Sequence, residues 1–399
     1  GSALTRFEIW SAALRAIRER PIFGWGADTF RLVFPMTKPL AYTKDAGYLS
    51  VADNVHDYPL QLGSAIGVPG FLLLYGLFGW VLYQGLPNAF SRGRGADRLI
   101  VTGFWAAALG YIVHLMFGLS VTGSTVFLWL ALALILAPTA TVSEHQPRSW
   151  GPAVAVLTAA TLAFASVFNV VYIVADNYYL KAQFGRQSGS ADPLQDIQTA
   201  IRLNPFNDMY RSQLGQVYQE QMSGWVSQAR TQQGQGQDTA ESLRNARSSF
   251  DLAEAALLDA IDFVPTEYDN YVFLAALYNQ AGSYFDPIYF DKAVATADKG
   301  IKVEPFGPAI RFQKALGLLS AGRTDEGIKV LEGTITMDPA YSDPISVLGD
   351  AYAKAGRLAD ARKQYEALLK LSPANTQAKQ AIDQIDARLA TGQPTTPTP

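Results

Sequence analysis

Four long apolar runs in the first half of the chain are separated by short polar loops. They cover residues 66–86, 99–119, 121–141 and 150–175, and only His114 interrupts the second. Each is about as long as the roughly 20 apolar residues that a helix needs to cross a bilayer. One such run is also typical of a buried core helix, but four in close succession favour a membrane. We therefore expect about four transmembrane helices within residues 66–175.

The cations of the short loops predict how these spans are oriented. The loops 87–98 and 142–149 contain Arg92, Arg94, Arg98 and Arg148, whereas the turn between the second and third runs has no cation. Short loops rich in arginine and lysine usually stay in the cytoplasm. We therefore expect these two loops on the cytoplasmic side, and residues 1–65 and everything after residue 175 outside the cytoplasmic membrane.

The segment before the first span has the pattern of an amphipathic helix over residues 3–20. Its apolar stripe at helical spacing is formed by Phe7, Trp10, Leu14 and Ile17, and Pro21 is expected to end the helix. Such a helix either lies in the membrane interface or packs on neighbouring spans, and the two arrangements are compatible. The glycines Gly24 and Gly26 that follow predict a tight turn.

The second half of the chain is polar and has an internal repeat. Pro305, Pro339 and Pro373 are spaced by 34 residues, and each closes a helix-like run. Pro205 and Pro265 close similar runs upstream, with 26 extra residues between them and six extra residues between Pro265 and Pro305. We expect the 26 extra residues to lie in and after the Gln- and Gly-rich stretch GWVSQARTQQGQGQD. We expect the six extra residues to lie between helices, near SYFDPIYF.

The last repeat shows the internal pattern of a helical hairpin. One face of its first helix carries Leu348, Gly349 and Tyr352, and the facing positions of its second helix are Ala361, Tyr365 and Leu368. This period and register resemble tetratricopeptide repeats, which stack into a curved solenoid with a concave groove. We expect such a solenoid with a cap helix over residues 176–390, a protein partner in its groove, and a disordered tail over 391–399. The fold class is therefore all-α.

Composition narrows the chemistry. The formal net charge of −3 does not suggest a nucleic-acid partner. The chain has no cysteine and three histidines, and its pattern indicates neither a metal site nor a cofactor. It begins with Gly-Ser in place of an initiator methionine, so we expect the natural polypeptide to be longer.

The segments TRFEIWSAALRAIRERPIFGWGADTF and NVHDYPLQLGSAIGVPG resemble the O-antigen ligase and O-antigen polymerase superfamily. The matching positions are Arg6, Trp10, Pro21, Gly24, Gly26, Phe30, His56, Leu60, Gln61, Gly67 and Gly70. The asparagine that follows the histidine in the family is Asp57 here, and HLMFGLSVTGS, with His114, resembles a second motif of members that carry repeats. The resemblance covers residues 5 to about 140 and also the fusion to repeats.

The resemblance implies a multi-pass protein of the bacterial cytoplasmic membrane and cell envelope. Members transfer a glycan from a polyprenyl-pyrophosphate carrier to an acceptor outside that membrane. Arg6 is then expected to bind phosphate and His56 to act as a base or to orient the acceptor, since arginine stays charged and imidazole accepts a proton near neutral pH. Further candidates for substrate binding are Arg15, Arg18, Arg31, Asp57 and His114.

A purely structural role remains an alternative for both histidines, and a non-catalytic role remains an alternative for the whole chain. His56 is also typical of a structural histidine before a span, and His114 of a buried hydrogen bond between helices. Two interpretations of the whole chain remain open. In the first, it is the C-terminal part of a glycan ligase or polymerase, that is, of a glycosyltransferase that is completed by spans upstream. In the second, it is a catalytically silent, membrane-anchored repeat scaffold within a larger membrane complex.

Overall fold

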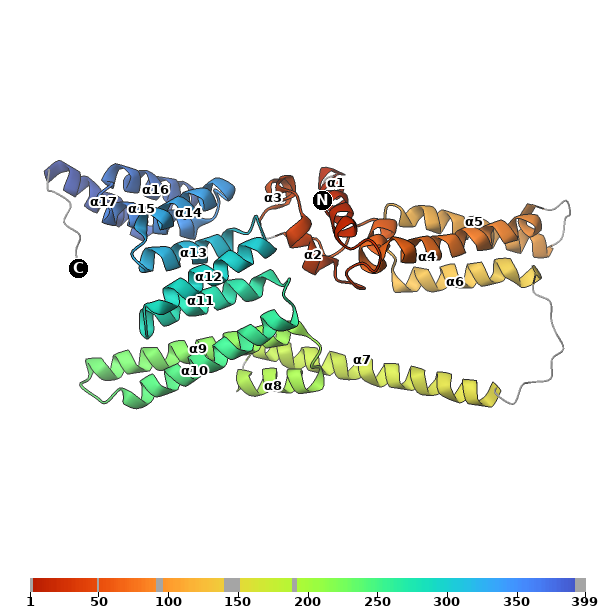
Figure 1. Cartoon of the computed structure of the whole chain (residues 1–399), viewed down its shortest axis with the longest axis horizontal. Coiled ribbons are helices and arrows are strands. Elements are labelled where there is room, and N and C mark those ends of the chain that lie inside the picture. The colour runs from red at the N-terminus through yellow and green to blue at the C-terminus, as the bar shows by residue number, and fades with distance from the viewer. Residues whose placement is uncertain (1–2, 49, 91–95, 140–150, 189–191, 392–399) are drawn as a thin grey trace. The chain divides into compact units, whose positions relative to one another are not determined.

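The structure is a computed structural model that describes residues 3–48, 50–90, 96–139, 151–188 and 192–391. Within these ranges every regular element is a helix, so the predicted all-α class is confirmed (Figure 1). The chain divides into two compact units, Gly1–Ala155 and Val156–Pro399, each with its own contacts. The predicted tail, apart from Thr391, lies outside the described residues, as do Arg92, Arg94 and Arg148.

The first unit begins with three helices that form a small head: α1 (Ala3–Glu19), α2 (Phe30–Thr37) and α3 (Leu40–Ala46). As predicted, α1 ends before Pro21. Its buried face, however, consists of Ile9, Ala12, Ala13 and Ala16, whereas Phe7 and Leu14 of the expected stripe are exposed. The small alanines let α1 approach Phe30, Phe34 and Tyr42 closely, so shape complementarity decides the packed face here.

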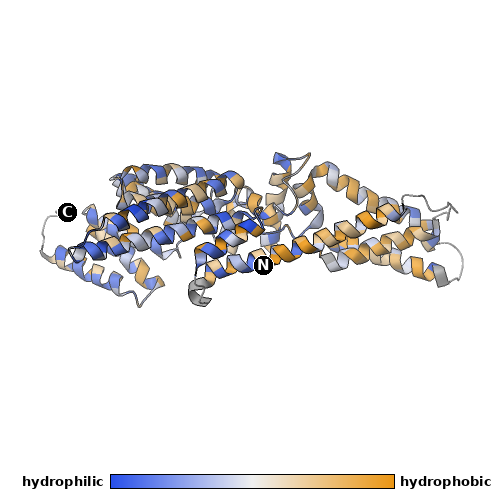
Figure 2. Cartoon of the chain, turned by 90° about the horizontal axis from the view of Figure 1, so that it is seen from below, coloured by the Kyte–Doolittle hydropathy of each residue, from blue (hydrophilic) through white to orange (hydrophobic). Residues whose placement is uncertain are grey.

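Three apolar helices follow the head: α4 (Tyr58–Phe90), α5 (Ala96–Leu115) and α6 (Thr122–Leu136). They share an apolar core that includes Phe78, Ala108, Leu132 and Ile135. Figure 2 shows hydrophobic residues along most of their length. Glycine allows their close approach, since a Cβ on Gly85 would lie 2.2 Å from Cγ2 of Ile135.

Three described helices are long and apolar enough to cross a membrane: α4, α5 and α7 (Gly151–Ser188). Of the expected third span, 121–141, the structure describes residues up to 139, which form the 15-residue α6 and the short 3-10 helix η1 (Ala137–Thr139). A span needs roughly 20 residues, so three of the described helices are candidate spans and α6 is a shorter apolar helix at the predicted place of the third. Pro138 lacks the N–H that would continue the α-helical bonding.

The helix α7 joins the apolar and polar halves of the chain without interruption. It contains 38 residues, and the most apolar stretch within it is not buried at all. Its later turns pack through Ala175 and Ala182 against α8 (Pro193–Leu203). Tyr210 belongs to the helix after α8, and its hydroxyl donates to the carboxylate of Asp176 on α7. The apolar helix therefore continues into the first helix of the repeat array.

Helical hairpins make up the rest of the second unit. Their helices are α9 (Asp208–Gly234), α10 (Ala240–Phe263), α11 (Tyr268–Tyr284), α12 (Ile288–Val303), α13 (Pro308–Ser320), α14 (Thr324–Met337), α15 (Ser342–Lys354), α16 (Leu358–Leu371) and the cap helix α17 (Thr376–Thr391). The five repeat prolines each lie two residues after a helix end: Pro205, Pro265, Pro305, Pro339 and Pro373. The predicted register is also confirmed, since Leu348, Tyr352, Ala361, Tyr365 and Leu368 are all buried.

The extra residues between the repeat prolines lengthen helices. The pair α9 and α10 is 14 and 10 residues longer than α15 and α16, and its connecting segment is two residues longer, which accounts for all 26. The six extra residues before Pro305 lengthen α11 by four and α12 by two. The insertions thus occur in the predicted stretches, and all but two of the extra residues lengthen helices. The six residues expected between helices lie instead within α11 and α12.

Candidate functional site

His56 lies in the segment between α3 and α4, two residues before α4 begins. Its backbone is in the left-handed region with φ +54°, which only Asp28 shares among the non-glycine residues of the described chain. A side chain in this region costs about 1–2 kcal/mol, and such strain is often found at functional sites. The imidazole is half-buried and lines a pocket of about 420 Å³.

Two residues of the ligase-like motif hold the backbone immediately before His56. The indole nitrogen of Trp10 donates to the carbonyl oxygen of Val55 over 3.1 Å. The side-chain oxygen of Gln61 accepts from the Val55 amide over 2.8 Å. Val55 itself is fully buried. The histidine is therefore positioned by α1 from one side and by the first turn of α4 from the other.

Asp57 begins α4 as its N-cap. Its carboxylate accepts from the amide of Leu60 over 2.8 Å, which satisfies one of the free N–H groups of the first turn. Burial raises the pKa of the Asp57 carboxyl above its ordinary value, and the bond from Leu60 partly offsets this. Asparagine and aspartate both serve as N-caps, so the departure from the family pattern at this position preserves the cap.

The pocket beside His56 is lined mainly by the head helices and the segment after them. Its lining residues are Thr5, Ile9, Tyr42, Asp45, Ala46, Ser50, Val51, Ala52, Asp53 and His56. The hydroxyl groups of Tyr42 and Ser50 lie 3.0 Å apart. Close by, one carboxylate oxygen of Glu8 is buried without a hydrogen-bond partner. Burial is the larger cause that raises the pKa of the Glu8 carboxyl, and the negative charge of Asp45 is the smaller one. Two carboxylates, those of Asp45 and Asp53, thus line this pocket with His56.

Sequence reasoning missed Asp45, Asp53 and Tyr42. These residues are separated in sequence and match no motif, so no pattern links them to His56. Only the packing of α1 against α3 and the following segment brings them to one pocket.

The candidate arginines do not line the described part of that pocket. Arg6 is exposed on α1, one turn before Trp10, so the two residues lie on one face of that helix. Arg15 donates from Nη1 to the carbonyl oxygen of Thr37 over 3.0 Å and so ties α1 to the end of α2. Arg18 is exposed and Arg31 is half-buried. Arg6 is therefore the arginine that shares a helix face with the residue holding the His56 segment.

His114 lies apart from His56, in the last turn of α5. Its ring is exposed and stacks on that of Tyr111 at 6.0 Å between centroids. The hydroxyl of Tyr111 is 2.7 Å from that of Ser124, in the first turn of α6. No cluster of three or more acidic or histidine side chains within the described ranges is arranged to hold a metal ion.

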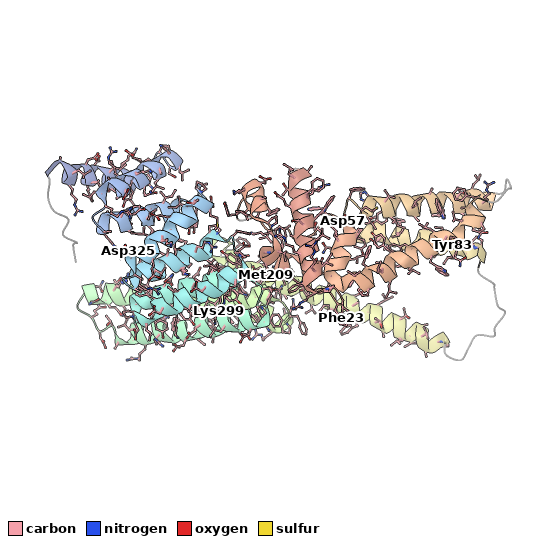
Figure 3. All side chains as sticks on the ribbon, turned by 45° about the horizontal axis from the view of Figure 1, so that its top comes forward. Phe23, Asp57, Tyr83, Met209, Lys299 and Asp325 are labelled. Carbon is pink, nitrogen blue, oxygen red and sulfur yellow. The ribbon has the colours of Figure 1, made fainter. Side chains whose placement is uncertain are left out.

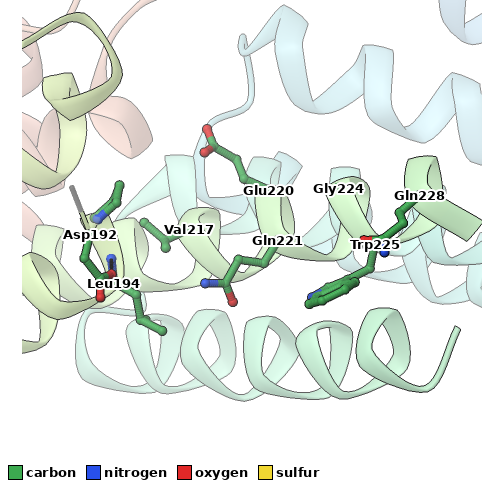
Figure 4. A pocket seen from close by; sticks show the side chains of 9 residues that line it. Asp192, Leu194, Val217, Glu220, Gln221, Gly224, Trp225 and Gln228 are labelled. Carbon is green, nitrogen blue, oxygen red and sulfur yellow. Dashed lines mark hydrogen bonds between the residues drawn. The ribbon is translucent and has the colours of Figure 1, made fainter. Parts of the chain in front are cut away.

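A second candidate site lies along the helix α9 of the repeat array. Pockets of about 620 and 500 Å³ lie on its two sides and share Glu220 and Gly224. The first is lined from α9 by Gln221, Trp225 and Gln228 and from the start of α8 by Asp192 and Leu194 (Figure 4). The second is lined by Gln216, Gln219 and Ser223 of α9 and by Phe273, Ala276 and Gln280 of α11.

These two pockets are rich in amide groups and carboxylates. None of their described lining residues is a lysine or arginine. The surface therefore offers hydrogen bonds to an uncharged or basic chain and has no cation to pair with an acidic one.

Comparisons with known proteins give one family match near each end of the chain. Residues 1–75 match the family model described as O-Antigen ligase, and residues 318–385 match a tetratricopeptide-repeat model. The chain thus joins a segment similar to O-antigen ligases to tetratricopeptide repeats, which generally bind protein partners, and its apolar helices indicate a membrane protein.

The individual relatives match only parts of the chain. The Protein STIP1 homolog of Dictyostelium discoideum is 27% identical over 113 residues, 28% of this chain and 20% of the relative. The TPR repeat-containing thioredoxin TTL4 of Arabidopsis thaliana is 30% identical over 74 residues, 18% of this chain and 11% of its own. A thermophilic TPR protein from Thermus thermophilus is 17% identical, with a TM-score of 0.39 over 53% of this chain and 99% of that one. The chain thus spans only a small part of its curated relatives.

Proposed function

We propose that this chain is the C-terminal part of a glycan ligase or polymerase that moves a glycan from a polyprenyl-pyrophosphate carrier to an acceptor. The observation that carries the proposal is the bond from Trp10 to Val55, which links the Arg-x-x-x-Trp helix to the histidine motif. Arg6 and His56 thereby flank one tryptophan although they are 50 residues apart in sequence.

The roles of the two residues follow from the reaction. The acceptor hydroxyl oxygen forms a bond to the anomeric carbon of the glycan while the bond from that carbon to the pyrophosphate breaks. The imidazole of His56 takes the hydroxyl proton or orients the hydroxyl. The guanidinium of Arg6 pairs with the departing pyrophosphate, whose negative charge grows as the bond breaks.

The other candidates have supporting roles in this proposal. Asp57 fixes the start of α4 through its cap, and Arg15 fixes α1 to α2. Arg18 and Arg31 remain candidates for binding the carrier phosphates. His114 belongs to a different part of the unit and is assigned to the membrane region of the substrate path.

For the location, we propose the cytoplasmic membrane of a bacterium. The loop that contains the candidate site, residues 1–65, and the repeat domain, 176–390, then lie outside the cytoplasm. This arrangement needs an even number of crossings, so in this proposal the shorter apolar helix α6 crosses the membrane as well as α4, α5 and α7. The cations of the loops 87–98 and 142–149 support this orientation.

The repeat array supports a second function: a scaffold that holds a protein partner beside the membrane. The pockets on both sides of α9 favour a partner segment that is uncharged or basic, because no described lining residue can pair with an acidic one. If the candidate site is silent, this scaffold function stands alone.

The decisive experiment replaces His56 by alanine in the complete native gene and measures lipid-linked glycan transfer in isolated membranes. We expect His56→Ala to abolish transfer and the matched change at the third histidine, His145→Ala, to preserve it. Transfer by the His56 variant at the unaltered rate would remove His56 from the mechanism. Absence of transfer by the unaltered protein, with partner capture retained, would favour the scaffold.

A further inference from the structure

The long helix α4 is broken at one residue. Gly67 has φ 76° and ψ 171°, far from helical values. From Val68 to Phe90 the helix continues for 23 residues, about 34 Å at 1.5 Å per residue. This matches the roughly 30 Å hydrocarbon core of a bilayer. The break therefore lies at the start of a helical segment that is long enough to span a bilayer.

The turn between α1 and α2 is fastened to this break. The amides of Trp25 and Gly26 donate to the carbonyl oxygens of Ser64 and Ala65 over 2.8 and 2.9 Å, and the Val68 amide donates to Pro21 over 2.8 Å. These bonds lie on both sides of Gly67. They satisfy backbone groups that the interrupted helix leaves free and fix the height of the turn along α4.

The backbones touch as closely as two glycines allow. A Cβ on Gly67 would lie 2.1 Å from the carbonyl oxygen of Ile22, and a Cβ on Gly24 would lie 2.5 Å from the carbonyl carbon of Ala65. Both glycines have positive φ. The turn is therefore rigid with respect to α4.

The side chains at the tip of this rigid turn point away from the protein. Ile22 is 60% exposed and Phe23 is 87% exposed. Figure 3 marks Phe23 and Asp57 toward the end of α4 opposite Tyr83. On α4 itself, the exposed side chains of Val68, Leu72 and Leu73 follow directly after the break. Exposed apolar side chains therefore occur both at the tip of the turn and on the first turns of α4 after the break.

Charged and aromatic groups occur at the same level. The guanidinium of Arg20 lies 4.0 Å from the ring centroid of Trp25, and the Trp25 indole nitrogen donates to the carbonyl oxygen of Ala16 over 3.0 Å. Tryptophan and arginine are the side chains that membrane proteins place among lipid head groups. In Figures 1 and 3, α1 runs across the end of α4, as a helix in the membrane surface does.

We propose that the turn at Ile22 and Phe23 is a membrane anchor whose two side chains insert among lipid acyl chains, with Arg20 and Trp25 at head-group level. The anchor holds the head, and with it the pocket beside His56, at the membrane surface. The proposal depends on α4 crossing the bilayer and not on the proposed glycan transfer.

The absence of cysteine from the chain makes the test direct. The full chain with Phe23→Cys carries a nitroxide label in liposomes of phosphatidylethanolamine and phosphatidylglycerol. Its accessibility to oxygen and to a water-soluble nickel chelate is measured by power saturation. We expect high oxygen and several-fold lower nickel accessibility than at Phe206→Cys, an equally apolar and 71% exposed site in the repeat half. Leu73→Cys provides the reference for a lipid-facing residue.

Each other outcome would overturn the proposal. Nickel accessibility equal to that at Phe206→Cys would place the tip in water. Low accessibility to both reagents would place it against protein, as a docking surface for further spans. Ile22→Cys gives the same readout if the Phe23 variant does not fold.

Discussion

The indole of Trp10 and the carbonyl of Val55 are joined by a 3.1 Å hydrogen bond across 45 residues of sequence. Because Val55 also donates to Gln61, its two backbone polar groups are both bound by side chains. The residue that follows, His56, has a backbone conformation that side chains rarely adopt. The bonds at Val55 therefore explain how a strained histidine is held at the start of α4.

Trp10→Phe tests this link. The carbonyl of Val55, a fully buried residue, loses its donor, which we expect to cost about 1 kcal/mol. The apparent melting temperature in detergent should fall. The matched control is Trp80→Phe, because Trp80 is 51% exposed on α4. Equal melting temperatures for the two variants would contradict a stabilising role for the Trp10 bond.

Replacement of His56 by glycine separates backbone strain from chemistry. Glycine adopts positive φ freely, so His56→Gly should be about 1 kcal/mol more stable than His56→Ala. Both variants remove the imidazole, and both should lose glycan transfer. Thermal unfolding of the two variants side by side measures the difference. A glycine variant less stable than the alanine variant would argue against strain at this residue.

Gly67→Ala tests the fastening of the turn to α4. The new Cβ would lie 2.1 Å from the Ile22 carbonyl oxygen at a φ of 76°, so we expect a loss of at least about 2 kcal/mol and a low yield of folded protein. Gly76→Ala is the control, since a Cβ there meets nothing within 4 Å. Size-exclusion profiles of the two variants should differ clearly. Similar profiles would mean that the turn can move away from α4.

The pKa of Asp57 predicts a pH dependence of stability. The folded protein binds the Asp57 proton more tightly than the unfolded chain, because burial raises this pKa above 3.8. The free energy of unfolding should therefore fall as the pH rises from 3.8 through the raised pKa and become constant above it. Asp57→Asn keeps the cap and should lack this decrease. The measurement is the free energy of unfolding of both proteins between about pH 3.5 and 7, the range in which carboxyl groups titrate. Parallel curves would remove Asp57 as the source.

Tyr210→Phe tests the junction between the apolar helix and the repeats. The hydroxyl of Tyr210 donates to Asp176 of α7, and a bond to a charged group contributes about 1.5–3 kcal/mol. Its loss should speed amide hydrogen exchange in the last turns of α7 by roughly tenfold or more. Tyr218→Phe is the control, because its bond to Gln198 is long, at 3.5 Å, and exposed. Unchanged exchange in Tyr210→Phe would show that packing alone holds the junction.

Local patterns predicted much of the repeat half. A proline two residues after each second helix and small residues at Gly349 and Ala361 depend only on nearby sequence, since a hairpin packs mainly on itself and its neighbours. A helix was predicted over residues 121–141, but its end at Leu136 was not. Apolar composition alone extends this segment to residue 141, whereas the helix ends at Leu136 before the turn that contains Pro138.

By itself, the sequence determined the all-α class, the apolar spans, the repeat register and the motif residues Trp10, His56 and Gln61. All of these depend on composition or on spacing within one segment. Only the tertiary structure decided that Trp10 and Gln61 bind Val55, that Asp45 and Asp53 share a pocket with His56, and that Gly24 and Gly67 bring the turn against α4. The physical reason is that these contacts join segments far apart in sequence. Their geometry depends on how closely the backbones pack, which no single-segment pattern records.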